Sequence, residues 1–143
     1  MMSQRGFSLV EALIALLVLS LGLMGVAAMQ LKALQSATQG YQRSVASVAA
    51  VDAQERMWGQ LAKLEPSQNC DDIDLGAVQT AWQSHWFQEE DHSPLRNAVE
   101  SQSDITRESG GSSCQFTVTL VLGSGDNDKL DYRFRLPSLE DLE

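Results

Sequence analysis

The chain is short of proline and of positive charge, and each shortage narrows what it can do. It has three prolines, and none lies between Phe7 and Leu64, so a helix can run through that stretch without interruption. Lysine and arginine number 10 against 19 aspartates and glutamates. Because an acidic surface repels phosphate backbones, we expect no direct contact with nucleic acid.

The groupings that carry enzyme chemistry are also missing. The chain has two cysteines, and their spacing is not C-x-x-C, which argues against metal and redox roles. No Ser/His/Asp group, phosphate-binding glycine loop or catalytic carboxylate pair stands out. His85 and His92 flank acidic residues, but this is too little for a zinc site. We therefore expect no enzyme, no cofactor and no resident metal.

Charge is absent from Ala12 to Leu31, a length that spans about 30 Å as a helix and matches the hydrocarbon core of a bilayer. Glu11 stands directly in front of this run. A carboxylate there costs about 2.5 to 3.5 kcal/mol on insertion scales, so a retained one usually has a partner and a function.

The residues around this carboxylate read Gly6-Phe7-Ser8-Leu9-Val10-Glu11, after a short polar leader that contains Arg5. The pattern resembles the class III signal of type IV prepilins. The resemblance implies that a prepilin peptidase cuts after Gly6, that the new terminus at Phe7 is methylated, and that the apolar helix stays on the mature protein. It also implies that Glu11 pairs with the terminal amine of a neighbouring subunit, a position that suits the helix dipole as well.

Two other interpretations compete for the same stretch. It could be an ordinary secretory signal cut after Ala28, or a plain single-pass anchor with an incidental glutamate. Neither requires Gly6-Phe7 in front of the apolar run and Glu11 at its start. One basic residue flanks each end of the run, Arg5 and Lys32, so the positive-inside rule gives almost no indication of the orientation.

The prepilin resemblance therefore supplies the orientation. It implies a bacterial inner-membrane protein with its head in the periplasm, which moves to a cell-surface pilus on assembly. An exported pair of cysteines usually forms a disulfide, so we expect a bond between Cys70 and Cys114. Such a bond contributes about 2 to 4 kcal/mol, a large share for a small core.

Together with the hydropathy pattern, the prepilin resemblance implies four parts: residues 1–6 as the leader, 7–31 as the transmembrane and assembly helix, 32–65 as its amphipathic continuation, and 66–143 as a periplasmic head. The helix is expected to run from about Phe7 to Leu64, ahead of Pro66. Its second half shows an apolar stripe at steps of three and four, which indicates the face that carries the head. The stripe comprises Leu34, Ala37, Tyr41, Val45, Val48, Val51, Trp58 and Leu61. Asp52 and Arg56 are spaced as an i,i+4 ion pair.

The head is predicted to be α+β. A helix is expected from about Asp74 to Gln88, with Trp82 and Trp86 on one face. We expect both to pack against the long helix or a sheet, and an exposed aromatic contact for a neighbouring subunit is the alternative. Residues 115–122 and 130–136 are β-rich and flank a turn, which predicts an antiparallel β-hairpin. Because two strands are marginal alone, a third is expected. Residues 99–105 are compatible with either a helix or an edge strand.

Within the type IV pilins, residues 11–23, Gln30 and residues 52–57 look most like the PilV-type minor pilins that modify the pilus. Major pilins typically carry a proline in the transmembrane part of the helix, and this chain has none there. The resemblance implies a minor structural subunit in pilus initiation, assembly or the tip complex. Its partners would be other major and minor pilins, the prepilin peptidase, the inner-membrane assembly platform and membrane lipid. A type II secretion pseudopilin and a pilus-associated adhesin are the alternatives.

Overall fold

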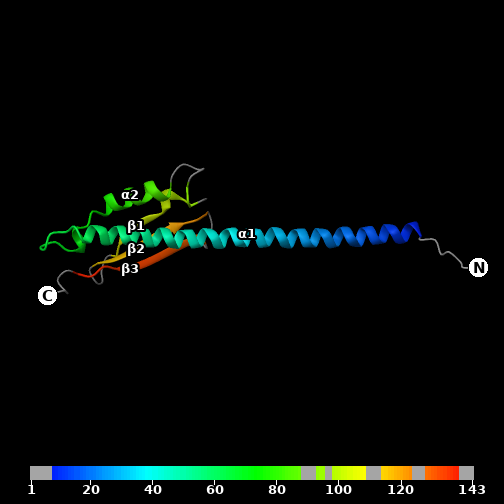
Figure 1. Cartoon of the computed structure of the whole chain (residues 1–143), viewed down its shortest axis with the longest axis horizontal. Coiled ribbons are helices and arrows are strands. Elements are labelled where there is room, and N and C mark those ends of the chain that lie inside the picture. The colour runs from blue at the N-terminus through cyan, green and yellow to red at the C-terminus, as the bar shows by residue number, and fades with distance from the viewer. Residues whose placement is uncertain (1–7, 88–92, 96–97, 109–113, 124–127, 139–143) are drawn as a thin grey trace, which may run out of the picture. The chain divides into compact units, whose positions relative to one another are not determined.

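The computed structural model describes residues 8–87, 93–95, 98–108, 114–123 and 128–138 (Figure 1). The chain divides into two compact units, residues 1–39 and 40–143, so the first helix contributes to both. In chain order the elements are α1 (Leu9–Leu61), the 3-10 helix η1 (Cys70–Asp72), α2 (Leu75–Trp86), the 3-10 helix η2 (Glu100–Gln102), and the strands β1 (Asp104–Arg107), β2 (Gln115–Val121) and β3 (Lys129–Arg135).

Helix α1 is a single helix, as the absence of proline predicts. It begins where the carbonyl oxygen of Ser8 accepts from the amides of Glu11 and Ala12, at 3.0 and 3.2 Å. After Leu61 the amide of Ala62 still bonds four residues back, but those of Lys63 and Leu64 bond only three residues back, which tightens the chain into a turn before Pro66. The observed bounds, Leu9–Leu61, lie within three residues of those expected at either end.

In the first unit, every described residue of α1 is exposed. By length and composition, α1 is long and apolar enough to cross a membrane, and its most apolar window has a mean hydropathy of 2.5. Within this part of α1, the hydroxyl group of Ser20 donates to the carbonyl oxygen of Leu17 at 2.8 Å. A polar side chain that is bonded within its own helix is compatible with an apolar environment.

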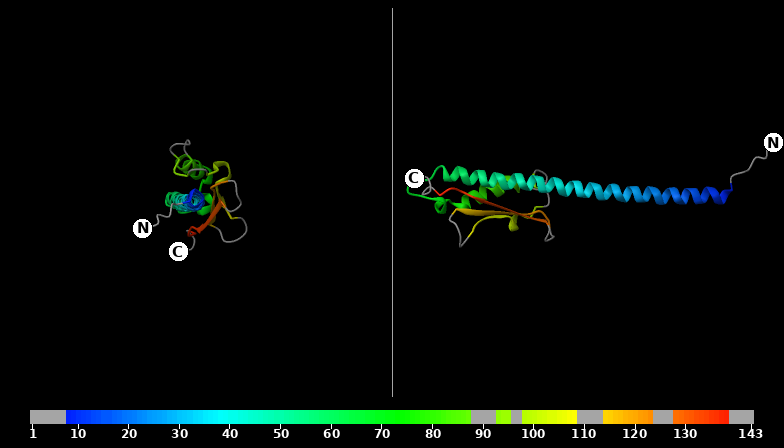
Figure 2. Two further views of the ribbon diagram at one scale, coloured as in Figure 1. Left: turned by 90° about the vertical axis from the view of Figure 1, so that its right-hand side faces the viewer. Right: turned by 90° about the horizontal axis from the view of Figure 1, so that it is seen from below.

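In the second unit, the strands form one antiparallel sheet in the order β1-β2-β3. Phe116 of β2 is opposite Phe134 of β3, and Val118 lies between Ile105 and Tyr132. These side chains point to one face, which the C-terminal part of α1 and helix α2 cover (Figure 2). The predicted hairpin is confirmed as β2 and β3, and β1 is the expected third strand of the sheet. Residues 99–105 contain both a helical turn, η2, and the start of β1.

The face of α1 that packs in the head is made mostly of alanine. Its buried members are Gln42, Ala46, Ala49, Ala50, Ala53, Met57 and Leu61. The predicted stripe is therefore wrong for most of its length: Tyr41 is 64% exposed and Val48 60%, whereas Leu61 is buried. Small side chains let α2 and the sheet approach this part of the helix backbone closely. Met57 and Leu61 are the large apolar residues that α1 adds to the core, and α2 and the sheet contribute Trp82, Phe116 and Leu120.

Helix α2 is attached to α1 through its two tryptophans, as expected from their shared face. Trp82 is fully buried, and its indole nitrogen donates to the carbonyl oxygen of Ala49 at 2.8 Å. The indole of Trp86 donates to Asp52 at 2.8 Å. The same carboxylate oxygen lies 2.7 Å from Nε of Arg56, which confirms the predicted ion pair. Each buried indole N–H therefore has an acceptor.

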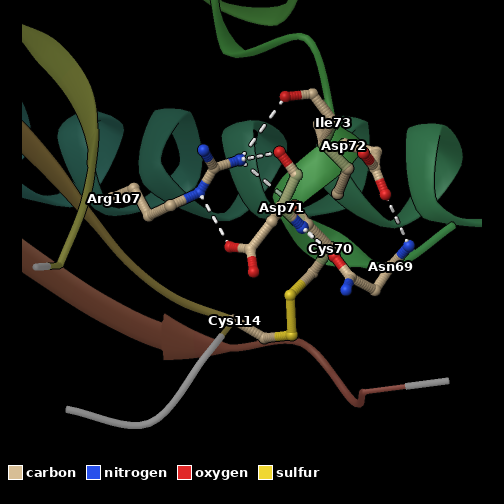
Figure 3. A network of polar contacts seen from close by, with 7 residues as sticks. All are labelled: Asn69, Cys70, Asp71, Asp72, Ile73, Arg107 and Cys114. Carbon is tan, nitrogen blue, oxygen red and sulfur yellow. Dashed lines mark hydrogen bonds and ion pairs between the residues drawn. A yellow bond between two sulfur atoms is a disulfide. The ribbon is translucent and has the colours of Figure 1, made fainter. Parts of the chain in front are cut away.

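The expected disulfide between Cys70 and Cys114 is present, with their Cα atoms 5.4 Å apart (Figure 3). It ties η1, which follows the long helix, to the residue before β2. Both cysteines are buried in the same core cluster as Phe116 and Met57. Together with the long helix and the three-stranded sheet, this bond gives the α+β architecture that the sequence predicts.

Candidate assembly site

The candidate assembly site is the start of α1, where Glu11 lies in the first helical turn. The carbonyl oxygen of Ser8 accepts the amide protons of Glu11 and Ala12, so this carboxylate sits among the first amides of the helix. Those amides form the positive end of the helix dipole, which favours a negative side chain there. Glu11 is exposed, and within the described residues nothing bonds to its carboxylate.

The surface that follows Glu11 is apolar on all sides. Its large exposed side chains are Leu13, Ile14, Leu16, Leu17, Val18, Leu19, Leu21, Leu23, Met24, Val26, Met29 and Leu31. An exposed apolar surface of this extent requires lipid or a protein partner to cover it. Glu11 is the only charged side chain between Ser8 and Leu31.

Of the residues predicted to take part in processing, Gly6 and Phe7 lie outside the described residues. Glu11 lies in a helix, as its predicted role requires. The pair Cys70 and Cys114 belongs to the second unit, where the two residues are joined to each other. His92, from the weak zinc pattern, also lies outside the described residues.

Residues 1–27 match the family model of the prokaryotic N-terminal methylation motif. No curated protein and no solved structure matches the chain. The matched segment includes the Gly6-Phe7 junction, Glu11 and most of the uncharged run, and it ends well before the head.

This match supports a structural subunit of the type IV pilin or pseudopilin class. The motif implies processing by a prepilin peptidase and assembly with other pilins. A prepilin-type motif followed by a long apolar helix is consistent with membrane anchoring.

The polar contacts that hold the head together extend beyond those that the sequence revealed. The hydroxyl of Tyr132 donates to Gln54 of α1 at 2.6 Å, which connects β3 to the helix. Arg107, at the end of β1, donates to three carbonyl oxygens around η1 (Figure 3). No spacing rule identifies either contact, because the partners are 78 and more than 30 residues apart in the sequence.

Within the residues that the structure describes, no group of three or more His, Cys, Asp or Glu side chains gathers to hold a metal. Trp82 and Trp86, which a surface ligand could have used if exposed, are buried against α1.

Proposed function

We propose that this chain is a minor pilin, a low-copy structural subunit that takes part in initiation, assembly or the tip complex of a type IV pilus. The observation that carries the proposal is the methylation motif over residues 1–27, which overlaps the start of a helix whose residues are all exposed from Leu9 to Gln39. Before assembly that surface would be covered by inner-membrane lipid, and afterwards by the helices of other pilins. The head would lie in the periplasm and then on the pilus.

In this function the peptidase cuts after Gly6 and leaves a methylated amine on Phe7. Glu11 of one subunit then pairs with the amine of its neighbour. An isolated carboxylate in an apolar environment is costly, and an ammonium partner removes much of that cost. The pairing therefore favours insertion of the subunit in one axial register.

Intact-mass analysis of the mature protein tests the proposal directly. We expect a chain that begins at Phe7 and carries one methyl group on its terminus. A chain that begins at Met29 would identify a secretory signal cut after Ala28. An unprocessed chain that begins before Gly6 would identify a plain membrane anchor.

A type II secretion pseudopilin is the second candidate, since the same motif and helix serve both assemblies. Deletion of the gene separates the two. We expect loss of surface pili with normal protein export, and copurification of the subunit with other minor pilins. Loss of export with intact pili would assign the chain to the secretion pseudopilus.

A further inference from the structure

The polar cluster between β1 and η1 makes contacts that the assembly role does not explain. Arg107 is the last residue of β1, and its Nη2 atom donates to the carbonyl oxygens of Cys70, Asp71 and Ile73 at 3.2, 3.1 and 3.5 Å (Figure 3). Its Nε atom lies 3.5 Å from a carboxylate oxygen of Asp71. One guanidinium thus binds the backbone at Cys70 and at the residues that follow it.

The position of this guanidinium is fixed from the sheet side. Arg107 pairs in register with Phe116, and its guanidinium carbon lies 5.5 Å from the centre of that ring. Phe116 is fully buried and lies two residues after Cys114 on the same segment. The β1–β2 pairing and the cation–π contact therefore hold the guanidinium at a set place relative to Cys114, without any part played by sulfur.

Cys114 is held by a second contact that does not involve its sulfur. Its φ angle is 74°, in the left-handed region that residues other than glycine rarely adopt. Its carbonyl oxygen accepts from the amide of Leu136 at 2.9 Å, next to the end of β3. The backbone carbonyl oxygen of each cysteine thus accepts a hydrogen bond that fixes its position. The donor is the side chain of Arg107 for Cys70 and the amide of Leu136 for Cys114.

The segment that Arg107 binds is itself preorganised. The side chain of Asn69 accepts from the amide of Asp71 at 2.8 Å, and the carboxylate of Asp72 accepts from the amide of Asn69 at 2.9 Å. This capping box holds η1 through hydrogen bonds that do not involve the guanidinium. Arg107 therefore contacts a turn that local hydrogen bonds also hold.

We propose that Arg107 is a positioning residue for closure of the Cys70–Cys114 disulfide. In the reduced head it keeps η1 against the start of β2, so that the two sulfur atoms are already neighbours when an oxidant arrives. The oxidant class is a disulfide, such as a protein oxidant of the exported compartment or oxidised glutathione. This inference does not depend on the assembly role, because it concerns only the second unit.

The reaction proceeds in two exchanges. One cysteine thiolate attacks the oxidant, which gives a mixed disulfide and releases one reduced thiol. The other cysteine thiolate then attacks the mixed disulfide, forms the Cys70–Cys114 bond and releases the second thiol. The two electrons and two protons lost by the cysteines are carried by the two released thiols. Arg107 acts on the second exchange, since only that step requires the two cysteines to meet.

The test uses the full-length chain in detergent micelles, reduced and then exposed to oxidised glutathione. Free thiols and glutathione adducts are followed by quenching and intact mass. For Arg107→Ala we expect closure to slow by about tenfold or more, as for loss of an intramolecular positioning effect, with the glutathione adduct accumulating. The closure rate of Arg107→Lys should lie between those of Arg107→Ala and the wild type, because an ammonium keeps the charge but not the planar fork of the guanidinium. Arg133→Ala, an exposed arginine on β3, is the matched control and should close at the wild-type rate.

A second measurement keeps the proposal testable if Arg107→Ala does not fold when reduced. In the double variant Cys70→Ser/Cys114→Ser, the amides of Asp71 and Asp72 should be better protected from hydrogen exchange than in the same variant with Arg107→Lys added, because their bonds to Asn69 are common to both chains. Equal protection in the two chains would overturn the proposal. So would a folded Arg107→Ala chain that closes at the wild-type rate without accumulating the adduct.

Discussion

Glu11 combines two properties at the scale of a single residue. Its carboxylate suits the amino end of α1, and it is also the one charge in front of an exposed apolar surface. Both roles need the negative charge, but their losses have different effects. Loss of the dipole interaction weakens the start of the helix by about 0.3 to 1 kcal/mol, whereas loss of the pairing lowers incorporation of the subunit into filaments. A substitution that keeps shape and removes charge therefore tests the pairing role through incorporation.

We predict that Glu11→Gln leaves peptidase cleavage intact and lowers incorporation into filaments at least severalfold. The amide retains the size of the side chain but cannot form an ion pair with a terminal ammonium. Immunoblots of sheared filaments and of membranes measure both quantities. Glu55→Gln is the control, since it removes an exposed carboxylate from the head part of the same helix. Normal incorporation of Glu11→Gln would refute the pairing role.

Trp82 is the residue on which the attachment of α2 to α1 most depends. It is fully buried and donates to the carbonyl oxygen of Ala49. We predict that Trp82→Phe lowers the free energy of unfolding of the head by about 1 to 3 kcal/mol, from the lost hydrogen bond and the unfilled volume. Denaturant unfolding followed by circular dichroism measures the change.

Trp58→Phe is the matched control for that substitution. Trp58 is 39% exposed and lies outside the core. Its replacement should change the stability by less than about 0.5 kcal/mol, as is usual at the surface. Equal losses at the two positions would contradict the special contribution of Trp82.

At the scale of elements, the alanine face of α1 sets the distance between the helix and the layers packed on it. Ala46, Ala49, Ala50 and Ala53 are all fully buried. A larger side chain at the centre of this face has no space to occupy and must displace α2 or the sheet.

We predict that Ala50→Leu destabilises the head by about 1 to 3 kcal/mol through overpacking. The same substitution at Ala37, an exposed helical position in the first unit, should leave head unfolding unchanged. Thermal unfolding of both variants in detergent provides the comparison. If Ala50→Leu leaves the stability of the head unchanged, α2 and the sheet can move away from α1 without cost, and the prediction is wrong.

The elements with strong local patterns could be predicted from the sequence. The β2 and β3 strands alternate apolar and polar residues and are separated by a turn, and α1 has no proline to stop it. Strand β1 has only four residues, Asp104–Arg107, and one buried side chain, so its strand conformation comes from pairing with β2. The packing face of α1 was missed because alanine carries little hydrophobic signal, while Tyr41 and Val48 carry a strong one and remain exposed.

The same distinction applies to the functional residues. Gly6, Phe7 and Glu11 lie within one stretch of six residues, so a local pattern was sufficient to predict their roles. The contacts of Arg107 join residues 34 to 37 positions apart, and its partners are mostly backbone carbonyl groups, which have no sequence signature. Such a contact becomes visible only once the fold brings β1 against η1.

At the scale of the whole molecule, the head has a small core, and the disulfide closes the loop from the end of the long helix to β2. We predict that Cys70→Ser/Cys114→Ser lowers the free energy of unfolding by about 2 to 4 kcal/mol, mainly because the unfolded chain gains freedom. Denaturant unfolding under oxidising conditions checks this. Reduced wild-type protein should show a similar loss, and no loss in either sample would contradict it.

The contacts between α1 and the rest of the head also determine how the protein bears a mechanical load. Side-chain hydrogen bonds join the helix to the rest of the head at Trp82 to Ala49, Trp86 to Asp52, Tyr132 to Gln54, and Arg56 to Ala81. A pull along the axis of α1 shears these bonds together and does not peel them apart one by one. Sliding the helix out of the head therefore requires their simultaneous rupture, which makes the head a mechanically strong attachment on a helix under tension.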